Sequence, residues 1–579
     1  MEEGYSAAGR GAGRQLEWWE RRQLENQGCV FAAGSDVVVK GHVDFGRIHG
    51  VRFAGSVTLG SLEQGELRDC ILEDVTLGDD VTVRNVPGGL KGLSVGDGAT
   101  VENVARIEIE PEAPCGVGTS VSVLDETGSR PVLIYPGLSA QMACLMARVP
   151  KWLENAPMGV AETFLSGRAV KAEIGERAPV RDCGMIRNVS IGREARVEGA
   201  RSLVNGSVVN NAAPGKALSH VGAGVYAENF IFEDAEVGCG AIVRNCYVGQ
   251  GCVISKGATA HDSLFFANCS IENGEAVAVL AGPYTVSMHK STLLIGCQTS
   301  FMNAGSCTNQ SNHMYKLGPV HWGILERGVK TSSNSYLMLG AKIGAFSLLM
   351  GSHKTHPDSS EFPFSYLFGD ERGATVVVPG AMLRSCGLLR DEKKWPTRDR
   401  RLKRKLPLYD RVNFAVLNPY TVEMMLRAID TIAELLSRPA DDDLYLRYKG
   451  MKFTRASLER ARHLYELAIY KYLPEGKFPE SDGEEAEEWV DIAGQLVPRS
   501  VLQSALTTLT PGHVEEIFSR AFSRYDELEL MWIARRFGKW WREREPMIAI
   551  GASDFDAIVE DDRTEYLENL YRETKMLEL

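Results

Sequence analysis

The chain has 579 residues and carries 64 Lys and Arg against 76 Asp and Glu, so its formal net charge is −12 at pH 7. Hydrophobic residues make up 44% of the chain and charged residues 24%, which excludes wholesale disorder. No apolar run approaches the ~18 residues that span a bilayer, the N-terminus lacks the apolar core of a signal peptide, and the acidic balance disfavours nucleic acid. We therefore expect a cytoplasmic protein that acts on a small-molecule substrate, with no membrane span and no nucleic-acid partner.

The composition changes along the chain and divides it into six predicted segments. The first two-thirds are rich in Gly, Val and Asn, whereas the part after about residue 415 is rich in Leu, Glu, Arg and Tyr. A helix is expected within 10–27, a strand at 130–136 and a helix at 138–154. The predicted segments are an N-terminal helical segment (1–30), first β coils (31–110), an insertion (111–173), a main β region with the site (174–389), a basic linker (390–417) and an α-helical domain (418–579).

A short motif recurs seven times in the β part of the chain. Each copy opens with a β-branched residue or Leu followed by Gly, an apolar residue follows six positions later, and a turn-prone residue is common at the eighth position. This spacing predicts a parallel β-helix with three short strands per coil, an aliphatic column inside, and Gly or Asn at corners that require a positive φ. The copies begin at Leu77, Val95, Ile174, Ile191, Val221, Val237 and Val248.

These motifs resemble those of the hexapeptide-repeat proteins, which form left-handed parallel β-helices. The resemblance implies a mainly β fold with α elements, in which hexapeptide coils are followed by the C-terminal α-helical domain. Acyltransferases of this kind use one His to deprotonate a hydroxyl or amine acceptor beside an acyl thioester, so the resemblance implies a CoA thioester donor and no other cofactor. It also implies a homo-oligomer, a trimer or, because the helical domain could obstruct a trimer, a dimer.

The whole chain is also similar to an uncharacterised bacterial family of β-helix proteins with a helical C-terminal extension. The segments that carry this similarity are NQSNHMYKLGP (309–319), PFSYL (363–367) and RDEKKWPTRDRR (390–401). This closer resemblance adds architecture rather than function.

Histidine is concentrated in one part of the β region. Five of the eleven histidines lie within residues 289–356, and imidazole is the usual general base near neutral pH. His313 is the first candidate base, followed by His289 and His353. A metal site is the rival interpretation of the cluster, but its spacings match no known ligand signature, so no metal ligand is assigned. A structural role for each His is the third alternative.

The stretch 300–323 is the most polar part of the β region, where earlier coils bury aliphatic side chains. Amides, hydroxyls and a few cations are what a sugar or phosphosugar requires, although an Asn/Ser-rich coil also makes turn bonds and side-chain ladders. The candidate substrate-binding residues are Asn303, Asn309, Gln310, Asn312, Tyr315 and Lys316, with Lys290 and Asp358 beside the histidines.

A basic run at 390–405 contains nine Lys and Arg in a chain of net negative charge. Guanidinium groups suit bidentate contacts to phosphate, so a phosphate, a nucleotide or the pyrophosphate of CoA could dock there. Solvated charge in a linker is the alternative. The candidate phosphate-binding residues are Lys393, Lys394, Arg398, Arg400 and Arg401.

After residue 415 the hydrophobic period changes to that of helices. Asn418 and Pro419 form a helix start, with proline at the first helical position. Further helices are expected near 454–472, 484–509, 513–543 and 562–577, and the acidic run at 484–488 is expected at a helix start.

The sequence thus favours a transferase that moves an acyl group from a thioester to a sugar, phosphosugar or sugar nucleotide, with a β-helix His as general base. A non-catalytic or regulatory scaffold that binds a sugar nucleotide is the first alternative. A metal-dependent enzyme acting on phosphosugars is the second.

Overall fold

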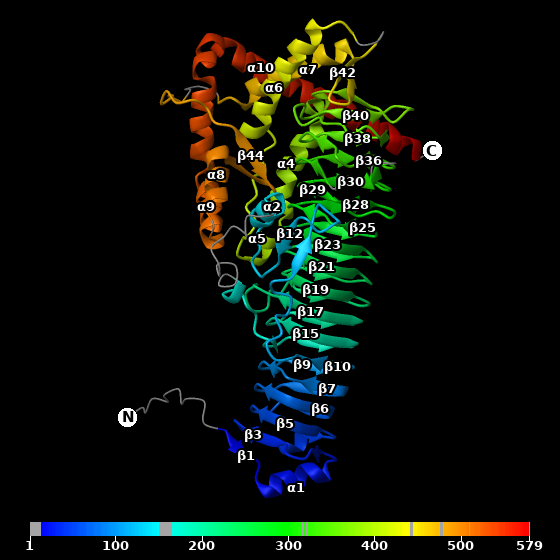
Figure 1. Ribbon diagram of the computed structural model, residues 1–579, viewed down its shortest axis with the longest axis vertical. Helices are drawn as coiled ribbons and strands as arrows, with labels where there is room; N and C mark the ends of the chain where they lie inside the picture. The colour runs from blue at the N-terminus through cyan, green and yellow to red at the C-terminus, as the bar shows by residue number, and fades with distance from the viewer. Residues whose placement is uncertain are drawn as a thin grey trace.

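The computed structural model describes residues 13–149, 165–311, 313–314, 318–319, 322–440, 444–474, 479–508 and 510–577. A β-helix forms the long axis of the molecule (Figure 1). Helix α1 (Trp18–Asn26) lies at its first end, and helices α6 (Pro419–Ser437), α7 (Arg455–Tyr472) and α10 (Tyr525–Leu577) gather at the other (Figure 1). The β-helix followed by a C-terminal helical region is confirmed.

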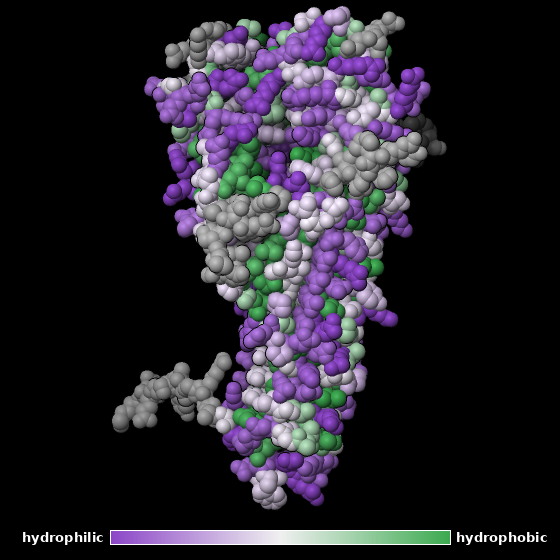
Figure 2. Space-filling view, in the orientation of Figure 1, coloured by the Kyte–Doolittle hydropathy of each residue, from purple (hydrophilic) through white to green (hydrophobic). Residues whose placement is uncertain are grey.

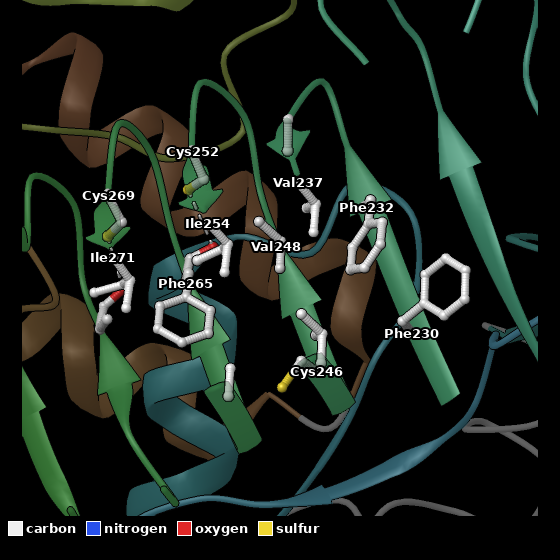
Figure 3. Close-up of a cluster of buried hydrophobic side chains, with 14 of the residues drawn as sticks. Phe230, Phe232, Val237, Cys246, Val248, Cys252, Ile254, Phe265, Cys269 and Ile271 are labelled. Carbon is white, nitrogen blue, oxygen red and sulfur yellow. Dashed lines mark hydrogen bonds between the residues drawn. The ribbon is translucent and has the colours of Figure 1, made fainter. Parts of the chain in front are cut away.

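The strands of successive coils stack in parallel, residue on residue. Strand β22 (Val253–Ser255) pairs with β24 (Ser270–Glu272) of the next coil, so that Ile254 lies directly beside Ile271. Both side chains are buried, and Figure 3 shows them pointing into the same interior as the aromatic and aliphatic residues of neighbouring coils. Because each coil buries its apolar face only against the next, the coils stabilise one another along the axis.

The predicted corner residues adopt the predicted backbone conformation. At the eighth motif position Asn85, Asn103, Asp182, Asn229 and Asn245 have φ values between 49° and 54°. Their side chains also form a ladder, in which Asn229 Nδ2 donates to Asn245 Oδ1 at 2.9 Å. Asn tolerates the left-handed backbone conformation, and its side chain can form a hydrogen bond with the corner residue of the next coil. Both properties favour Asn at the corner.

The coils before and after the insertion form one continuous column. Strand β8 (Ser94–Val95) pairs in parallel with β13 (Glu173–Ile174), although 77 residues lie between the two strands in the sequence. The chain therefore leaves the column after β10 (Arg106–Glu108) and rejoins it in register.

The insertion contains the predicted strand and helix. Strands β11 (Ser120–Ser122) and β12 (Pro131–Leu133) form a hairpin, and α2 (Ala140–Arg148) follows. Met142 of α2 belongs to a buried cluster with Leu264 of the β-helix and Phe518 of the C-terminal region. On the face seen in Figure 2, hydrophobic surface is visible where these parts lie against the column.

The basic segment, which the sequence predicts to be a linker, is largely helical. Helix α4 (Cys386–Arg398) and the short α5 (Arg400–Arg404) run back along the side of the β-helix. Asp399 caps α5, since its side chain accepts a hydrogen bond from the backbone of Arg401.

One C-terminal prediction is wrong. Instead of one helix over 484–509, β44 (Trp489–Ile492) and β45 (Gln495–Pro498) form a hairpin, and α8 (Arg499–Thr507) begins only after it. The turn residues Ala493 and Gly494 have φ values of 47° and 98°, which a helix does not tolerate. The acidic run at 484–488 therefore precedes a strand and not a helix.

The other helices agree with the sequence in place but differ in length. Helix α9 (Pro511–Ser523) and α10 share the predicted 513–543, and the predicted 562–577 is the end of α10. None of the helices in the described part of the chain is both long and apolar enough to cross a bilayer.

Candidate functional site: a basic groove along the β-helix

A groove of about 650 Å³ lies between one face of the β-helix and the basic helices α4 and α5. Its floor is a column of outward-facing side chains from strands that stack on one another. Ser270, Val286, Asn303 and Lys330 are register partners in β24, β27 (Val286–Ser287), β30 (Asn303–Ala304) and β35 (Lys330–Thr331). Adjacent strands of a sheet lie about 4.8 Å apart, so this column offers evenly spaced contacts to an elongated ligand.

The opposite wall carries the cations. Arg398, Arg400 and Lys403 of α4 and α5 line the groove. Arg398 and Lys403 are exposed, and neither forms an ion pair with a described residue. Lys330 on the floor, by contrast, is held by Asp391 at 2.5 Å. Two cations of this wall are thus available to an anionic ligand.

A buried clamp fixes this wall against the β-helix. Asp399 and Arg401 form a buried ion pair with Nη2 and Oδ2 at 2.7 Å. Burial opposes ionisation of Asp399, but the Arg401 guanidinium outweighs it and holds the pKa of that carboxyl below its usual value. Asn268 of the β-helix donates from Nδ2 to Asp399 at 3.0 Å and accepts at Oδ1 from the backbone N–H of Arg400 at 2.9 Å.

Two of the predicted phosphate-binding residues, Arg400 and Arg401, have different roles in this clamp. Arg401 is used internally, because Asp399 and the carbonyl of Asp410 take its guanidinium. Arg400 is anchored through Nη1 to the carbonyl of Gly251 at 2.5 Å but still lines the groove.

His289 and Asn303 are the predicted β-helix residues that the fold places in the same groove as Arg398 and Arg400. His289 follows β27 at a corner of the coil and is exposed, and its carbonyl accepts from Thr292 Oγ1 at 3.0 Å. Asn303 lies one coil further along, where it stacks on Val286. Lys290 is exposed beside His289 but is not among the residues that line the groove.

Two other predicted residues lie inside the β-helix. Gln310 and His353 are buried and share one inward-facing column through Leu337, their common register partner. Gln310 accepts from the Ile295 N–H at 2.9 Å, and His353 Nδ1 lies 3.0 Å from Thr375 Oγ1. Burial lowers the pKa of His353 to about 4, so its imidazole is neutral and shielded from substrate.

The remaining predicted residues lie elsewhere. Asn309 is exposed on the neighbouring face of the coil, beside Tyr336. Asp358 pairs with Lys342 in a bridge on the third face. Lys393 and Lys394 belong to α4 but do not line the groove.

The described residues do not include all of the predicted site. The backbone of His313 lies in strand β32 (His313–Met314), which pairs with β33 (Gly318–Pro319). The side chain of His313 and the residues Asn312, Tyr315 and Lys316 lie outside the described part of the chain.

The aromatic end of the groove was not predicted from the sequence. Tyr284 and Phe301 stack with their ring centroids 5.6 Å apart, and Trp395 of α4 lies 4.8 Å from Phe301. All three line the groove. The sequence signal was Trp395, the one aromatic residue inside the basic run, because an aromatic ring among cations is typical of sites that hold a nucleotide.

A metal centre was the rival interpretation of the histidine cluster. Among the residues that the structure describes, no three His, Cys, Asp or Glu side chains come together in a way that could hold a metal ion.

The fold and the groove define the class of protein: a long β-helix with a helical C-terminal region and a cation-lined groove between them. The chain belongs to the family described as domain of unknown function DUF4954, whose model matches residues 14–436. A second model, described as domain of unknown function DUF6819, matches residues 477–572. No curated protein matches the chain. The first match contains every residue that lines the groove.

Proposed function

We propose that the basic groove binds a phosphate-bearing acyl thioester such as acyl-CoA and that the protein transfers its acyl group to a sugar, phosphosugar or sugar nucleotide. The observation that carries this proposal is that one groove contains both His289 and Asn303 and two cations, Arg398 and Lys403, that have no described carboxylate partner. Charge-assisted contacts of Arg and Lys to phosphate are among the strong hydrogen bonds of proteins.

The residues that line the groove suit such a donor. Arg398, Arg400 and Lys403 would take the phosphates, and the half-buried ring of Trp395 offers a face on which a base can stack. The thioester would then lie along the floor column toward His289.

His289 would act as the general base. A ring nitrogen of the neutral imidazole takes the proton of the acceptor hydroxyl while that oxygen attacks the thioester carbon. The new C–O bond forms, the C–S bond breaks, and the imidazolium returns the proton to the departing thiolate. The Asn303 amide would orient the acceptor, since it faces the groove one coil from Val286, which lies in the strand that precedes His289.

We also propose that the coils are of the left-handed hexapeptide type. The recurrence of buried apolar residues every six positions, as from Leu77 to Val83 and from Val95 to Val101, supports this, together with the positive-φ corners at Asn85 and Asn103. The cytoplasmic location and the homo-oligomer, trimer or dimer, stay predictions of the sequence.

One observation favours a second candidate, a module that binds a sugar nucleotide without chemistry. The hydrogen bond between His289 and Thr292 uses the backbone carbonyl of His289, and none from a described residue orients its ring, whereas catalytic imidazoles are commonly held by a carboxylate or carbonyl. In this alternative the groove and its cations serve binding alone.

The two candidates are separated by His289→Gln, with Lys290→Gln as the matched neighbour. For a general base we expect turnover of acetyl-CoA with sugar acceptors to fall about 10²–10⁴-fold in His289→Gln, while the affinity for CoA stays within about twofold and Lys290→Gln behaves like the wild type. Unchanged turnover in His289→Gln would remove His289 from the chemistry. Ligand binding without turnover in the wild type would establish the binding module.

A further inference from the structure

A second cavity, of about 250 Å³, lies on a different face of the β-helix from the basic groove. Its β-helix side is formed by β29 (Cys297–Thr299), β34 (Gly323–Leu325) and the residues that follow them. Helix α6 and strand β44 of the C-terminal region close it from the other side. The cavity therefore exists only because the C-terminal region packs against the column.

Three buried polar side chains line this cavity with atoms that lack a partner. Arg327 and Trp489 are each 1% exposed and Gln298 is 7% exposed. Arg327 Nη1, Trp489 Nε1 and Gln298 Oε1 form no hydrogen bond with any described residue. An unsatisfied buried donor or acceptor costs about 1–3 kcal/mol, and native proteins contain few of them. Three in one small cavity indicate a polar ligand.

The Arg327 side chain is held in place by groups that leave Nη1 open. Its Nη2 donates to the carbonyl of Asn413 at 2.5 Å, and its Nε lies 3.6 Å from Asp491 Oδ2. The guanidinium carbon also lies 5.2 Å from the centre of the Phe301 ring. A guanidinium held in this way, with Nη1 free of hydrogen bonds to described residues, is preorganised to receive an oxygen atom of a ligand.

The charges around the cavity disfavour an anion. The carboxyl groups of Glu326, Glu488 and Asp491 line it together with Arg148 and Arg327. Asp491 accepts from the Gly494 N–H at 2.7 Å and faces Arg327, so the positive charge of Arg327 is already countered. Burial raises the pKa of Glu326 to about 8, with Asp491 adding to the effect, which makes that carboxyl a hydrogen-bond donor at neutral pH.

The cavity thus offers two unpaired donors and one unpaired acceptor in surroundings whose charges are balanced. These match a neutral ligand whose groups both accept and donate hydrogen bonds. Hydroxyl groups do this, and several of them on a compact carbon skeleton fit a volume of this size. We infer that this cavity binds a neutral monosaccharide, whose hydroxyls accept from Arg327 Nη1 and Trp489 Nε1 and donate to Gln298 Oε1. This site is separate from the basic groove, so it does not depend on the proposed acyl transfer.

Saturation-transfer NMR on the full-length protein tests this inference with glucose, mannose, galactose, fucose and N-acetylglucosamine as probes. Gluconate and inorganic phosphate serve as anionic competitors. We expect at least one hexose to bind. We expect about tenfold weaker binding in Trp489→Phe, which keeps the ring but removes Nε1, and in Gln298→Leu, which keeps the volume but removes the amide.

Two control variants separate this site from the rest of the molecule. Trp18→Phe changes an exposed tryptophan at the far end of the column, and the double variant Arg398→Ala/Lys403→Ala alters the basic groove; both should bind the hexose like the wild type. Thermal melts verify that each variant is folded. Absence of hexose binding, binding that Trp489→Phe and Gln298→Leu leave unchanged, or preferential binding of gluconate or phosphate would each overturn the inference.

Discussion

At the scale of single residues, the corners of the coil show why one amino acid recurs. Asn245 has a φ of 49°, accepts from Asn229 Nδ2 at 2.9 Å and donates to Asp262 Oδ1 at 3.0 Å. Gly satisfies the backbone conformation but not the ladder, and Ala satisfies neither. Substituting Asn245 by Gly and by Ala therefore separates the contribution of the backbone conformation to stability from that of the side-chain hydrogen bonds.

We predict that Asn245→Ala lowers the free energy of unfolding by about 2 kcal/mol, from left-handed strain of about 1 kcal/mol and two lost hydrogen bonds of about 0.5 kcal/mol each. Asn245→Gly should lose less, because it removes only the ladder bonds. Urea denaturation measures both. Equal losses in the two variants would show that the backbone conformation contributes nothing.

The buried carboxyl of Glu326 predicts a pH dependence. Its pKa is raised to about 8 by burial, so between its unfolded pKa near 4.5 and about 8 the folded state binds a proton that the unfolded state has released. The slope of stability with pH is then negative in this window. The wild type should lose stability relative to Glu326→Gln as the pH rises from 5 to 8, by at most about 1.4 kcal/mol per pH unit.

Chemical denaturation of both proteins at several pH values gives this difference. Comparison with Glu326→Gln removes the contributions of the other buried carboxyls, which both proteins share. A difference that stays constant from pH 5 to pH 8 would contradict a raised pKa for Glu326.

At the scale of elements, the Asp399–Arg401 pair decides whether the basic wall exists. Helix α5 has only five residues, and isolated helices of that length are unstable in water. Its position rests on the buried pair and on Asn268, which bridges it to the β-helix.

We predict that Asp399→Ala costs about 3–5 kcal/mol, because it leaves the buried Arg401 charge without its partner. The double variant Asp399→Leu/Arg401→Met should recover part of this loss, since it removes the stranded charge. Thermal or urea unfolding gives the free energies, and hydrogen exchange of 399–405 reports the helix itself. A double variant less stable than Asp399→Ala would contradict this explanation.

The elements differ in how far the sequence alone could predict them. The coils were predictable because apolar residues such as Val83 and corner residues such as Asn85 are encoded locally, at fixed spacing. The hairpin at 489–498 could not be predicted, because its apolar residues fit a helical pattern equally well. Only the turn at Ala493 and Gly494 is incompatible with a helix.

The candidate site was predictable only in part. His289 and Asn303 were recognised, and the fold brings them into one groove with Arg398 and Arg400. Gln310 and His353 were recognised by residue type, but in a strand alternate residues face opposite sides. The sequence did not show which side of the coil was the interior. The cavity at Arg327 joins residues separated by more than 160 positions, such as Arg327 and Trp489, and no local pattern connects them.

At the scale of the whole molecule, three parts share one buried cluster. Met142 of the insertion, Leu264 of the β-helix and Phe518 of α9 belong to it. Asp410 adds a polar connection, since its carboxylate accepts from the backbone N–H groups of Ala140 and Ala267, each at 2.7 Å. The insertion and the C-terminal region are therefore expected to loosen together.

We predict that Phe518→Ala lowers stability by about 3–5 kcal/mol through the cavity that it leaves. It should accelerate hydrogen exchange in α2 as well as in α9, while the coils near Val83 remain protected. Mass-spectrometric hydrogen exchange resolves these regions. Faster exchange confined to α9 would contradict the shared cluster.

The central claim is that the groove between the β-helix and α4–α5 binds a phosphate-bearing donor through the cations that face it. Titration calorimetry with CoA tests it on the wild type, on Arg398→Ala/Lys403→Ala, and on Lys393→Ala/Lys394→Ala, which removes the same charge from the same segment outside the groove. We predict about 100-fold weaker binding in the first double variant, from two contacts of about 1.5 kcal/mol each, and less than about threefold in the second. Equal losses in the two variants, or a wild type that binds no CoA, would contradict the claim.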